Sequence, residues 1–357
     1  MKIDAVILGA SGYGGGELLY WLSRHPNVGS VRGTSRSLAG SPFSLAHPNL
    51  RGVVEGRFEP HSLWTSSGKI WQELAQSEQP VVFAALPHGE LARTLPTLEA
   101  AWAEAGIADR LLLLDLSGDF RIRDPAAFEK ANRTPHPCPE LLSRFVYGLP
   151  EWNRDAISRA KRIASPGCFA TALQLALLPL RGMNVGFIAA NAVTGSSGSG
   201  ATPSLATHHA TRANDFRAYK ILAHQHVAEV RLMMSACDIL GTLAFVPNSG
   251  PFVRGIFATI QFAKPNDLDL NQLEARVANV FSGHPFVRIV EESPRVAAVA
   301  GSNFADVAIA ADENSVAVMV AIDNLGKGMA GQALQSMNIA LGLPETTGLW
   351  SVGRFLN

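Results

Sequence analysis

One cysteine of this chain stands where its sulfur could act as a nucleophile. Cys168 follows Pro166-Gly167 and opens an apolar stretch, Phe169 to Leu180, whose pattern predicts a helix. Unpaired N–H groups and the dipole at the start of a helix lower a thiol pKa and stabilise the thiolate. Such a thiolate can attack a carbonyl carbon while backbone amides receive the developing oxyanion. Cys168 is therefore the candidate nucleophile.

The other two cysteines lack this environment. Cys237 lies within a helix-like segment, and Cys138 stands between two prolines. Three widely spaced cysteines, in a chain that begins without a secretion signal, indicate reduced thiols and no disulfide framework. We therefore expect a cytoplasmic protein.

Histidines supply the candidate general acid and base. His224-Gln225-His226, followed by Glu229, is the strongest cluster, and His208-His209 is a second one. Histidines together with a cysteine also occur at zinc sites, but no second cysteine lies close enough to Cys168 for structural zinc spacing. We expect no metal, and a zinc hydrolase is a distant alternative.

A glycine-rich turn near the N-terminus is typical of dinucleotide binding. Gly9-Ala10-Ser11-Gly12-Tyr13-Gly14-Gly15 joins an expected strand, Lys2 to Leu8, to an expected helix, Gly15 to Arg24. The glycines permit a sharp turn and a close approach, and the helix start offers N–H groups to a pyrophosphate. A purely structural turn is the alternative, but the strand–turn–helix context favours the cofactor site.

The residues after the second expected strand indicate which dinucleotide binds. They are Thr34-Ser35-Arg36-Ser37, and no acidic residue occurs between Glu17 and Glu55. An acidic residue would hold a ribose 2′-hydroxyl, whereas hydroxyl groups and a guanidinium suit a 2′-phosphate. We therefore predict NADP(H), with a solvated surface arginine as the alternative.

Composition gives no support for several classes of partner. The 357 residues carry 30 basic and 30 acidic side chains, and 47% of the residues are hydrophobic. The balanced charge gives no electrostatic reason to expect nucleic acid or an anionic membrane surface. The chain shows no apolar run of the roughly 18 to 20 residues that a membrane span needs.

The order of the predicted elements indicates an α/β protein with two domains. In the first half, strands at 27–33, 81–86 and 111–116 alternate with helices such as 90–105, which predicts a parallel sheet covered on both faces. After about residue 150, strands at 186–194, 242–247, 255–262, 286–291 and 315–322 follow with few helices between them, which predicts an α+β domain. A last helix is expected at 329–341. The Ser/Gly-rich segment 195–200 is expected to be a loop at a site.

Together, these segments resemble one family, the N-acetyl-γ-glutamyl-phosphate reductases, with their relatives that reduce carrier-linked aminoadipyl or glutamyl phosphates. The resemblance runs nearly end to end, and the cysteine segment is its most specific part. The segments that carry it, besides the glycine turn, are Thr34-Ser35-Arg36, 47–52, 86–89, Asp115-Leu116-Ser117-Gly118-Asp119-Phe120-Arg121, 165–171, 224–226, 301–304 and 323–328.

The resemblance implies a Rossmann-type cofactor domain and an α+β catalytic domain, as in semialdehyde and glyceraldehyde-phosphate dehydrogenases. Residues 1–150 and 327–357 would form the first domain, and 151–326 the second. Ser11 to Gly14 and Ser35 to Ser37 would hold NADP, and Asn324 would lie at the nicotinamide. The site residues implied further are Cys168 as nucleophile, His224 or His226 as acid/base with His226 favoured, and Arg121 and Arg254 as substrate anchors. A homodimer or homotetramer is expected.

The implied reaction is NADPH-dependent reduction of N-acetyl-glutamyl 5-phosphate to the 5-semialdehyde through a cysteinyl thioester. Two features are closer to the carrier-linked relatives, namely Ala228 in place of a common proline and the segment 207–212. The segments 165–168 and 194–198 are more similar to the N-acetyl enzymes. An acidic amino-group carrier protein therefore stays open as a partner. A dinucleotide-binding redox sensor that uses Cys168 as a switch is the alternative from another class.

Overall fold

A computed structural model describes residues 1–66, 68–266 and 268–353. The chain groups into two compact units. Unit 1 comprises Met1–Pro166 and Ala330–Leu349, and unit 2 comprises Gly167–Met329 with the described residues after Leu349. Each unit contains one seven-stranded sheet. The division at residues 150 and 327 stays a prediction, and its last four residues, 354–357, lie outside the described residues.

Unit 1 contains the parallel sheet that the alternating pattern predicts. Its strand order is β3-β2-β1-β4-β5-β7-β6, and the neighbouring strands pair in parallel. The chain moves outward from β1 to β3 and then returns to the other side of β1, so the order reverses between β1 and β4. Ligands of such sheets bind at the carboxyl ends of the strands at this reversal. The strands are β1 (Ile3–Leu8), β2 (Val28–Ser35), β3 (Glu59–Pro60), β4 (Gln79–Ala84), β5 (Leu112–Asp115), β6 (Val146–Tyr147) and β7 (Arg162–Ala164).

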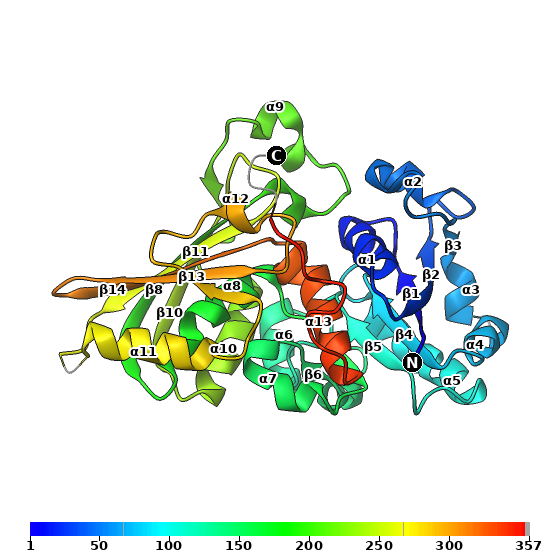
Figure 1. Cartoon of the computed structure of the whole chain (residues 1–357), viewed down its shortest axis with the longest axis horizontal. Helices are drawn as coiled ribbons and strands as arrows, with labels where there is room; N and C mark the ends of the chain where they lie inside the picture. Colours follow the sequence, from blue (N-terminus) through cyan, green and yellow to red (C-terminus); the bar gives the residue numbers. More distant parts are fainter. Residues whose placement is uncertain (67, 267, 354–357) are drawn as a thin grey trace. The chain divides into compact units, whose positions relative to one another are not determined.

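Helices cover both faces of this sheet. In Figure 1, α1 and α13 lie on one side of the strands and α3 to α5 on the other. Residues 81–84 of β4 have 0% exposure, because a parallel strand between two helical layers is buried on both faces. The helices are α1 (Tyr13–Ser23), α2 (Phe43–Ala46), α3 (His61–Ser66), α4 (Gly68–Leu74), α5 (Glu90–Glu104), α6 (Pro125–Asn132), α7 (Pro150–Ile157) and α13 (Gly331–Ala340).

Unit 2 contains a mixed sheet, as expected for an α+β domain. Its order is β12-β13-β14-β11-β8-β10-β9, with β8–β10 and β12–β13 parallel and the other neighbours antiparallel. The strands are β8 (Asn184–Thr194), β9 (Arg217–Ala218), β10 (Leu240–Ser249), β11 (Ile256–Ala263), β12 (Val287–Ile289), β13 (Ala305–Ala311) and β14 (Ser315–Ile322).

One face of the unit 2 sheet packs against helices, and the other face is partly exposed. Figure 1 shows α8 (Cys168–Leu177), α10 (His226–Ala236) and α11 (Leu270–Phe281) along the same side of the strands. Residues of β8 alternate accordingly, since Ile188 and Ala190 are buried while Ala189 and Asn191 are exposed. The short helices α9 (His209–Arg212) and α12 (Val296–Val299) complete the unit.

The sequence pattern missed or misplaced several elements. It did not predict β13 (Ala305–Ala311), which is rich in alanine, contains Asp306 and shows no clear alternation. The last helix begins at Gly331 instead of Met329, because a π-helical turn, Gly326–Ala330, precedes it. Among the described residues, no helix combines the length and apolarity that crossing a membrane requires.

Candidate active site

Cys168 is the first residue of α8, as its place after Pro-Gly predicts. Gly167 caps the helix with extended backbone angles, φ −69° and ψ 146°, so the N–H groups of the first turn point away from the helix body. All residues of α8 after Cys168 are buried, which holds the helix in place by its apolar faces. Cys168 itself is partly exposed, whereas Cys138 and Cys237 are buried. The nucleophile predicted from the sequence is thus the most accessible thiol of the three.

The start of α10 packs directly against the start of α8. A Cβ built on Gly167 would overlap the imidazole of His226, so any larger residue here would have to displace that ring. The carboxylate of Glu229, one turn further along α10, accepts a hydrogen bond from Gly167 N at 3.0 Å. Gln174 of α8 donates to the carbonyl of Glu229 at 3.2 Å. These contacts place the His226 ring beside the residue that precedes Cys168.

His224 packs against the ring of His226 and is 6% exposed. Its ring centroid is 4.6 Å from that of His226, and its Nδ1 accepts a hydrogen bond from His226 N at 3.2 Å. Burial, followed by the neighbouring His226 and Lys220, lowers the pKa of His224 to about 3. A histidine with this pKa is neutral near pH 7, so it is not present there as an imidazolium acid. The low pKa of His224 argues against it as the general acid, and the choice of His226 stays a prediction.

The second histidine cluster lies elsewhere in unit 2. His208 precedes α9 and His209 begins it, and both side chains are exposed. The rings that surround Phe169, next to Cys168, are instead those of His224, His226 and Phe245. Within the described ranges, no three histidine, cysteine, aspartate or glutamate side chains gather as they would around a metal ion.

Tyr219 is a site residue that the sequence reasoning missed. Its ring lies 5.9 Å from that of His224. Burial raises the pKa of Tyr219, and the negative charge of the nearby Cys168 thiolate raises it further. The phenol therefore stays protonated. Its position five residues before His224 was the only available signal, and residue type alone does not separate it from a core tyrosine.

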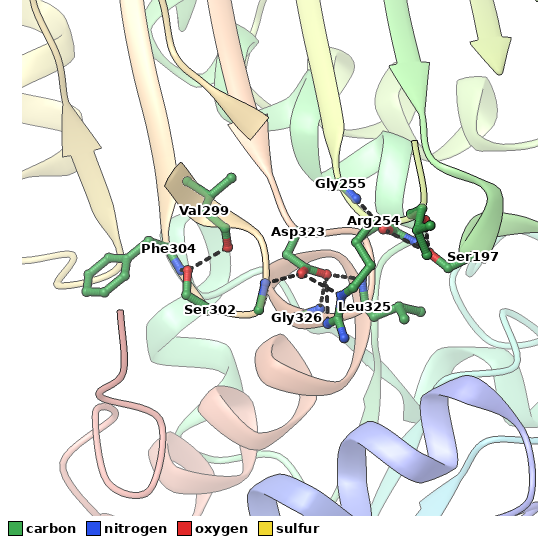
Figure 2. A network of polar contacts seen from close by, with 12 residues as sticks. Ser197, Arg254, Gly255, Val299, Ser302, Phe304, Asp323, Leu325 and Gly326 are labelled. Carbon is green, nitrogen blue, oxygen red and sulfur yellow. Dashed lines mark hydrogen bonds and ion pairs between the residues drawn. The ribbon is translucent and has the colours of Figure 1, made fainter. Parts of the chain in front are cut away.

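Two side chains after β14 organise the loops of unit 2 near Cys168. Asn324 is 2% exposed, accepts from Gly255 N at 2.7 Å and donates to the Ser197 hydroxyl at 2.9 Å. The Ser/Gly-rich segment 195–200 therefore contacts the turn after β14 through Ser197. Arg254 binds the buried carboxylate of Asp323 through Nε at 2.9 Å and Nη2 at 3.1 Å (Figure 2). The role of Arg254 as a substrate anchor stays a prediction.

The glycine turn of unit 1 has the shape of a cofactor cradle. Gly9 has a φ of +84°, and a Cβ there would lie 2.5 Å from the carbonyl of Ala85, so only glycine fits. A Cβ on Gly12 would meet only the Gly9 carbonyl at 3.9 Å, which leaves its backbone open to a ligand. α1 begins at Tyr13, so the N–H groups of its first turn, Gly14 included, follow at once. These residues fit a dinucleotide pyrophosphate.

The last residue of β2, Ser35, lies beside this turn, and Arg36 and Ser37 follow it. The hydroxyls of Ser11 and Ser35 are 2.9 Å apart, which joins the two loops. Arg36 is 63% exposed and forms an ion pair with Glu90 at 2.7 Å, and Ser37 is also exposed. The turn, Ser35, Arg36 and Ser37 thus come together in unit 1, at the point where the strand order reverses.

Arg121, the other predicted substrate anchor, also belongs to unit 1. Its Nε donates to the carbonyl of Ser165 at 2.7 Å, and its Nη2 approaches the carbonyl of Leu116 at 3.4 Å. The guanidinium is therefore held at the end of the segment that leads into Cys168. Its contact with a substrate stays a prediction.

Comparison with known proteins defines the class. Residues 4–160 match the model of the semialdehyde dehydrogenase NAD binding domain, and residues 168–324 match that of the semialdehyde dehydrogenase dimerisation domain. The chain therefore belongs to the semialdehyde dehydrogenase family and is an oxidoreductase with a nicotinamide-dinucleotide-binding domain.

Two curated relatives show which kind of reductase the chain is similar to within this family. The chain is 39% identical to an N-acetyl-gamma-glutamyl-phosphate reductase from Methanopyrus kandleri, over 97% of this chain and 98% of that one. It is 36% identical to a LysW-L-2-aminoadipate 6-phosphate reductase from Deinococcus radiodurans, over 99% of this chain and 98% of the relative. Among solved structures, aspartate semialdehyde dehydrogenase II from Vibrio cholerae matches with a TM-score of 0.70 at 15% identity, over 96% and 99% of the two chains, which shows the shared fold.

Proposed function

We propose that this protein reduces an acyl phosphate to an aldehyde, with NADPH as the reductant and Cys168 as the nucleophile. The observation that carries the proposal is the placement of a partly exposed thiol at the first residue of α8, directly after Gly167, whose Cα faces the imidazole of His226. Relatives that align with almost the whole chain are named as phosphate reductases, which supports the same reaction. N-acetyl-glutamyl 5-phosphate is the substrate that we propose first.

The chain's own residues account for the covalent steps. The Cys168 thiolate attacks the acyl carbon, a C–S bond forms, and the C–O bond to phosphate breaks, so inorganic phosphate leaves with its electron pair. The reduced nicotinamide, when bound, supplies the hydride that the thioester carbonyl accepts. His226, as imidazolium, gives a proton to the resulting alkoxide. The hemithioacetal then returns that proton to the imidazole as the C–S bond breaks, which releases the aldehyde and restores the thiolate.

NADP, and not NAD, is the cofactor that we propose. The glycine turn would hold the pyrophosphate through the N–H groups at the start of α1, and Ser35, Arg36 and Ser37 would surround the 2′-phosphate. The exposed guanidinium of Arg36 supports this assignment. Its ion pair with Glu90 is weak because the arginine side chain lies in solvent, so a phosphate can replace the carboxylate as its partner.

The experiment is a steady-state assay in the oxidative direction, with N-acetylglutamate semialdehyde, NADP and inorganic phosphate. We expect NADP reduction that requires both phosphate and the aldehyde. Cys168→Ala should bind NADPH as the wild type does and lose turnover, with Cys237→Ala as the matched control that keeps it. Undiminished turnover by Cys168→Ala would reject the nucleophile.

A carrier-linked substrate is the second candidate, and an exposed segment favours it. Segment 201–222 carries apolar side chains at the surface, with Leu205 90% and Leu222 64% exposed, beside the cationic Lys220 and the Arg217–Asp215 ion pair. Such a surface suits an acidic carrier protein. The same assay with the carrier-bound semialdehyde decides, since a carrier enzyme should turn over the free N-acetyl compound far more slowly. No phosphate-dependent turnover of either compound would favour the redox-sensor hypothesis.

Self-association is the third part of the proposal. The helix-free face of the unit 2 sheet includes a shallow hollow lined by residues of β8, β10 and β11, among them Ala189, Val246 and Phe257. Phe187 on the same strand face is 62% exposed. A second copy covering this face would bury its apolar surface. We expect a homodimer or homotetramer by light scattering, and Ala189→Glu should shift it toward monomer. The cytoplasmic location stays a prediction from the sequence.

A further inference from the structure

The carboxylate of Asp323 connects segments that are distant in the chain. Asp323 follows the last residue of β14, Ile322, and its side chain is fully buried. Arg254, which precedes β11, reaches it with two guanidinium nitrogens, at 2.9 Å and 3.1 Å. Figure 2 shows both side chains directed toward each other, with the dashed contacts converging on the two carboxylate oxygens.

Backbone donors from two further places meet at the same carboxylate. Gly301 N donates to Oδ2, the oxygen that also binds Arg254 Nε. Leu325 N and Gly326 N donate to Oδ1 at 2.8 Å and 3.0 Å. One buried anion thus ties the segment before β11, the segment before β13 and the turn after β14 to one another. Charge-assisted bonds of this kind are about twice as strong as neutral ones.

The turn 323–328, which Asp323 holds, packs against Cys168. The carbonyl of Asp323 accepts from Gly328 N at 2.8 Å, which closes the turn 323–328. A Cβ on Gly328 would lie 2.9 Å from the Cβ of Cys168, so the glycine backbone forms the wall against which the nucleophile rests. Asn324 stands in the same turn and is fixed to Gly255 and Ser197. A displacement of this turn moves the support of the reactive cysteine.

We propose that Asp323 and Arg254 are positioning residues, whose ion pair holds the turn 323–328 against Cys168 in the geometry that its reaction requires. The inference rests on the proposed function only in taking Cys168 as the nucleophile. It assigns Arg254 to the support of the site instead of the binding of substrate. A misplacement near 1 Å in such a support can reduce a rate by about a hundredfold.

Three variants test the pair. Asp323→Asn keeps the volume and one acceptor oxygen but turns the other into a donor. In either orientation of the amide, one Arg254 nitrogen and at least one backbone N–H lose their acceptor. Arg254→Lys keeps the positive charge and loses the planar fork that binds both oxygens. Asp312→Asn is the matched control, because Asp312 also accepts two backbone N–H groups, from Asn314 and Ser315, but in an exposed turn.

Two readouts are needed. The first is kcat and KM in the semialdehyde assay, where we expect kcat of Asp323→Asn to fall by about thirty- to a hundredfold at nearly constant KM for the aldehyde. Arg254→Lys should fall less, and Asp312→Asn should match the wild type. The second is the rate of Cys168 alkylation by iodoacetamide, measured by mass spectrometry. That rate should drop severalfold in Asp323→Asn, and it requires no knowledge of the substrate.

The outcomes separate this inference from the proposed function. A wild type that turns over no semialdehyde rejects the function, while the alkylation rates still decide the positioning role. Unchanged kcat and alkylation in a folded Asp323→Asn overturn the inference. If that variant does not fold, Arg254→Lys decides, because Arg254 is partly exposed. A raised KM at constant kcat in Arg254→Lys would make Arg254 a substrate anchor and overturn the inference as well.

Discussion

Replacing His224 by asparagine separates its role from that of His226. His224 is nearly fully buried, and burial is the main reason why its pKa falls to about 3. Its Nδ1 accepts the hydrogen bond from His226 N, and the side-chain oxygen of asparagine can take over that bond. The substitution therefore removes a titrating group and leaves the start of α10 supported.

The size of the effect follows from the two pKa values. In the unfolded chain a histidine has its ordinary pKa of about 6.5, so it binds a proton below that pH, while the folded protein keeps His224 neutral down to about pH 3. The stability that the neutral form provides is present above pH 6.5 and is lost as the pH falls toward 3. At about 1.36 kcal/mol per pH unit, the loss between pH 7 and pH 5 is about 2 kcal/mol.

The assay is urea unfolding at pH 7 and at pH 5, with the fluorescence of a probe in unit 2 as the signal. The wild type should lose about 2 kcal/mol more free energy of unfolding between these pH values than His224→Asn loses. His209→Asn is the matched control, since it removes an exposed histidine of the same unit and should keep the wild-type dependence.

An equal pH dependence in the wild type and in His224→Asn would refute this reasoning. It would mean that His224 is protonated in the folded protein near pH 6, and that it could serve as the acid. The expected result would instead leave His226 as the donor. In the reductive direction kcat should then fall at high pH, where the donor loses its proton, and His226→Asn should remove this fall while His224→Asn retains it.

Three further substitutions test other parts of the site. Gly167→Ala should lower kcat by at least about tenfold, because its Cβ displaces the His226 ring. Steady-state kinetics measures the loss, and an unchanged melting temperature shows that the variant is folded. Arg36→Gln should raise KM for NADPH by about tenfold and leave KM for NADH unchanged, if Arg36 pairs the 2′-phosphate. Asp119→Asn should lower the pKa of His88, measured by NMR titration, because the hydrogen bond and charge of Asp119 raise that pKa; an unchanged His88 titration would contradict the pairing.

The sequence alone predicts the parts of this protein that depend on neighbouring residues. The run Ile3–Leu8, the glycines at 9 and 12 and the helix from Tyr13 form one strand–turn–helix unit. The strand shows as a short, almost wholly apolar and buried run, and the helix buries one side of its residues. The position of Cys168 at a helix start follows in the same way from Pro-Gly and the apolar stretch behind it. Turn chemistry and periodicity are local, so reading them requires no knowledge of the rest of the chain.

Only the tertiary structure decides which distant residues meet. Gly167 and Glu229 are 62 positions apart, and Arg254 and Asp323 are 69 apart, yet each pair shares a hydrogen bond. The order of strands in the sheets brings such residues together, and many orders are compatible with one pattern of strands and helices. The same applies to burial, which makes His224 neutral and sets it apart from His226 two residues later. A pKa depends on the atoms packed around a group, and those atoms come from segments that the local sequence does not specify.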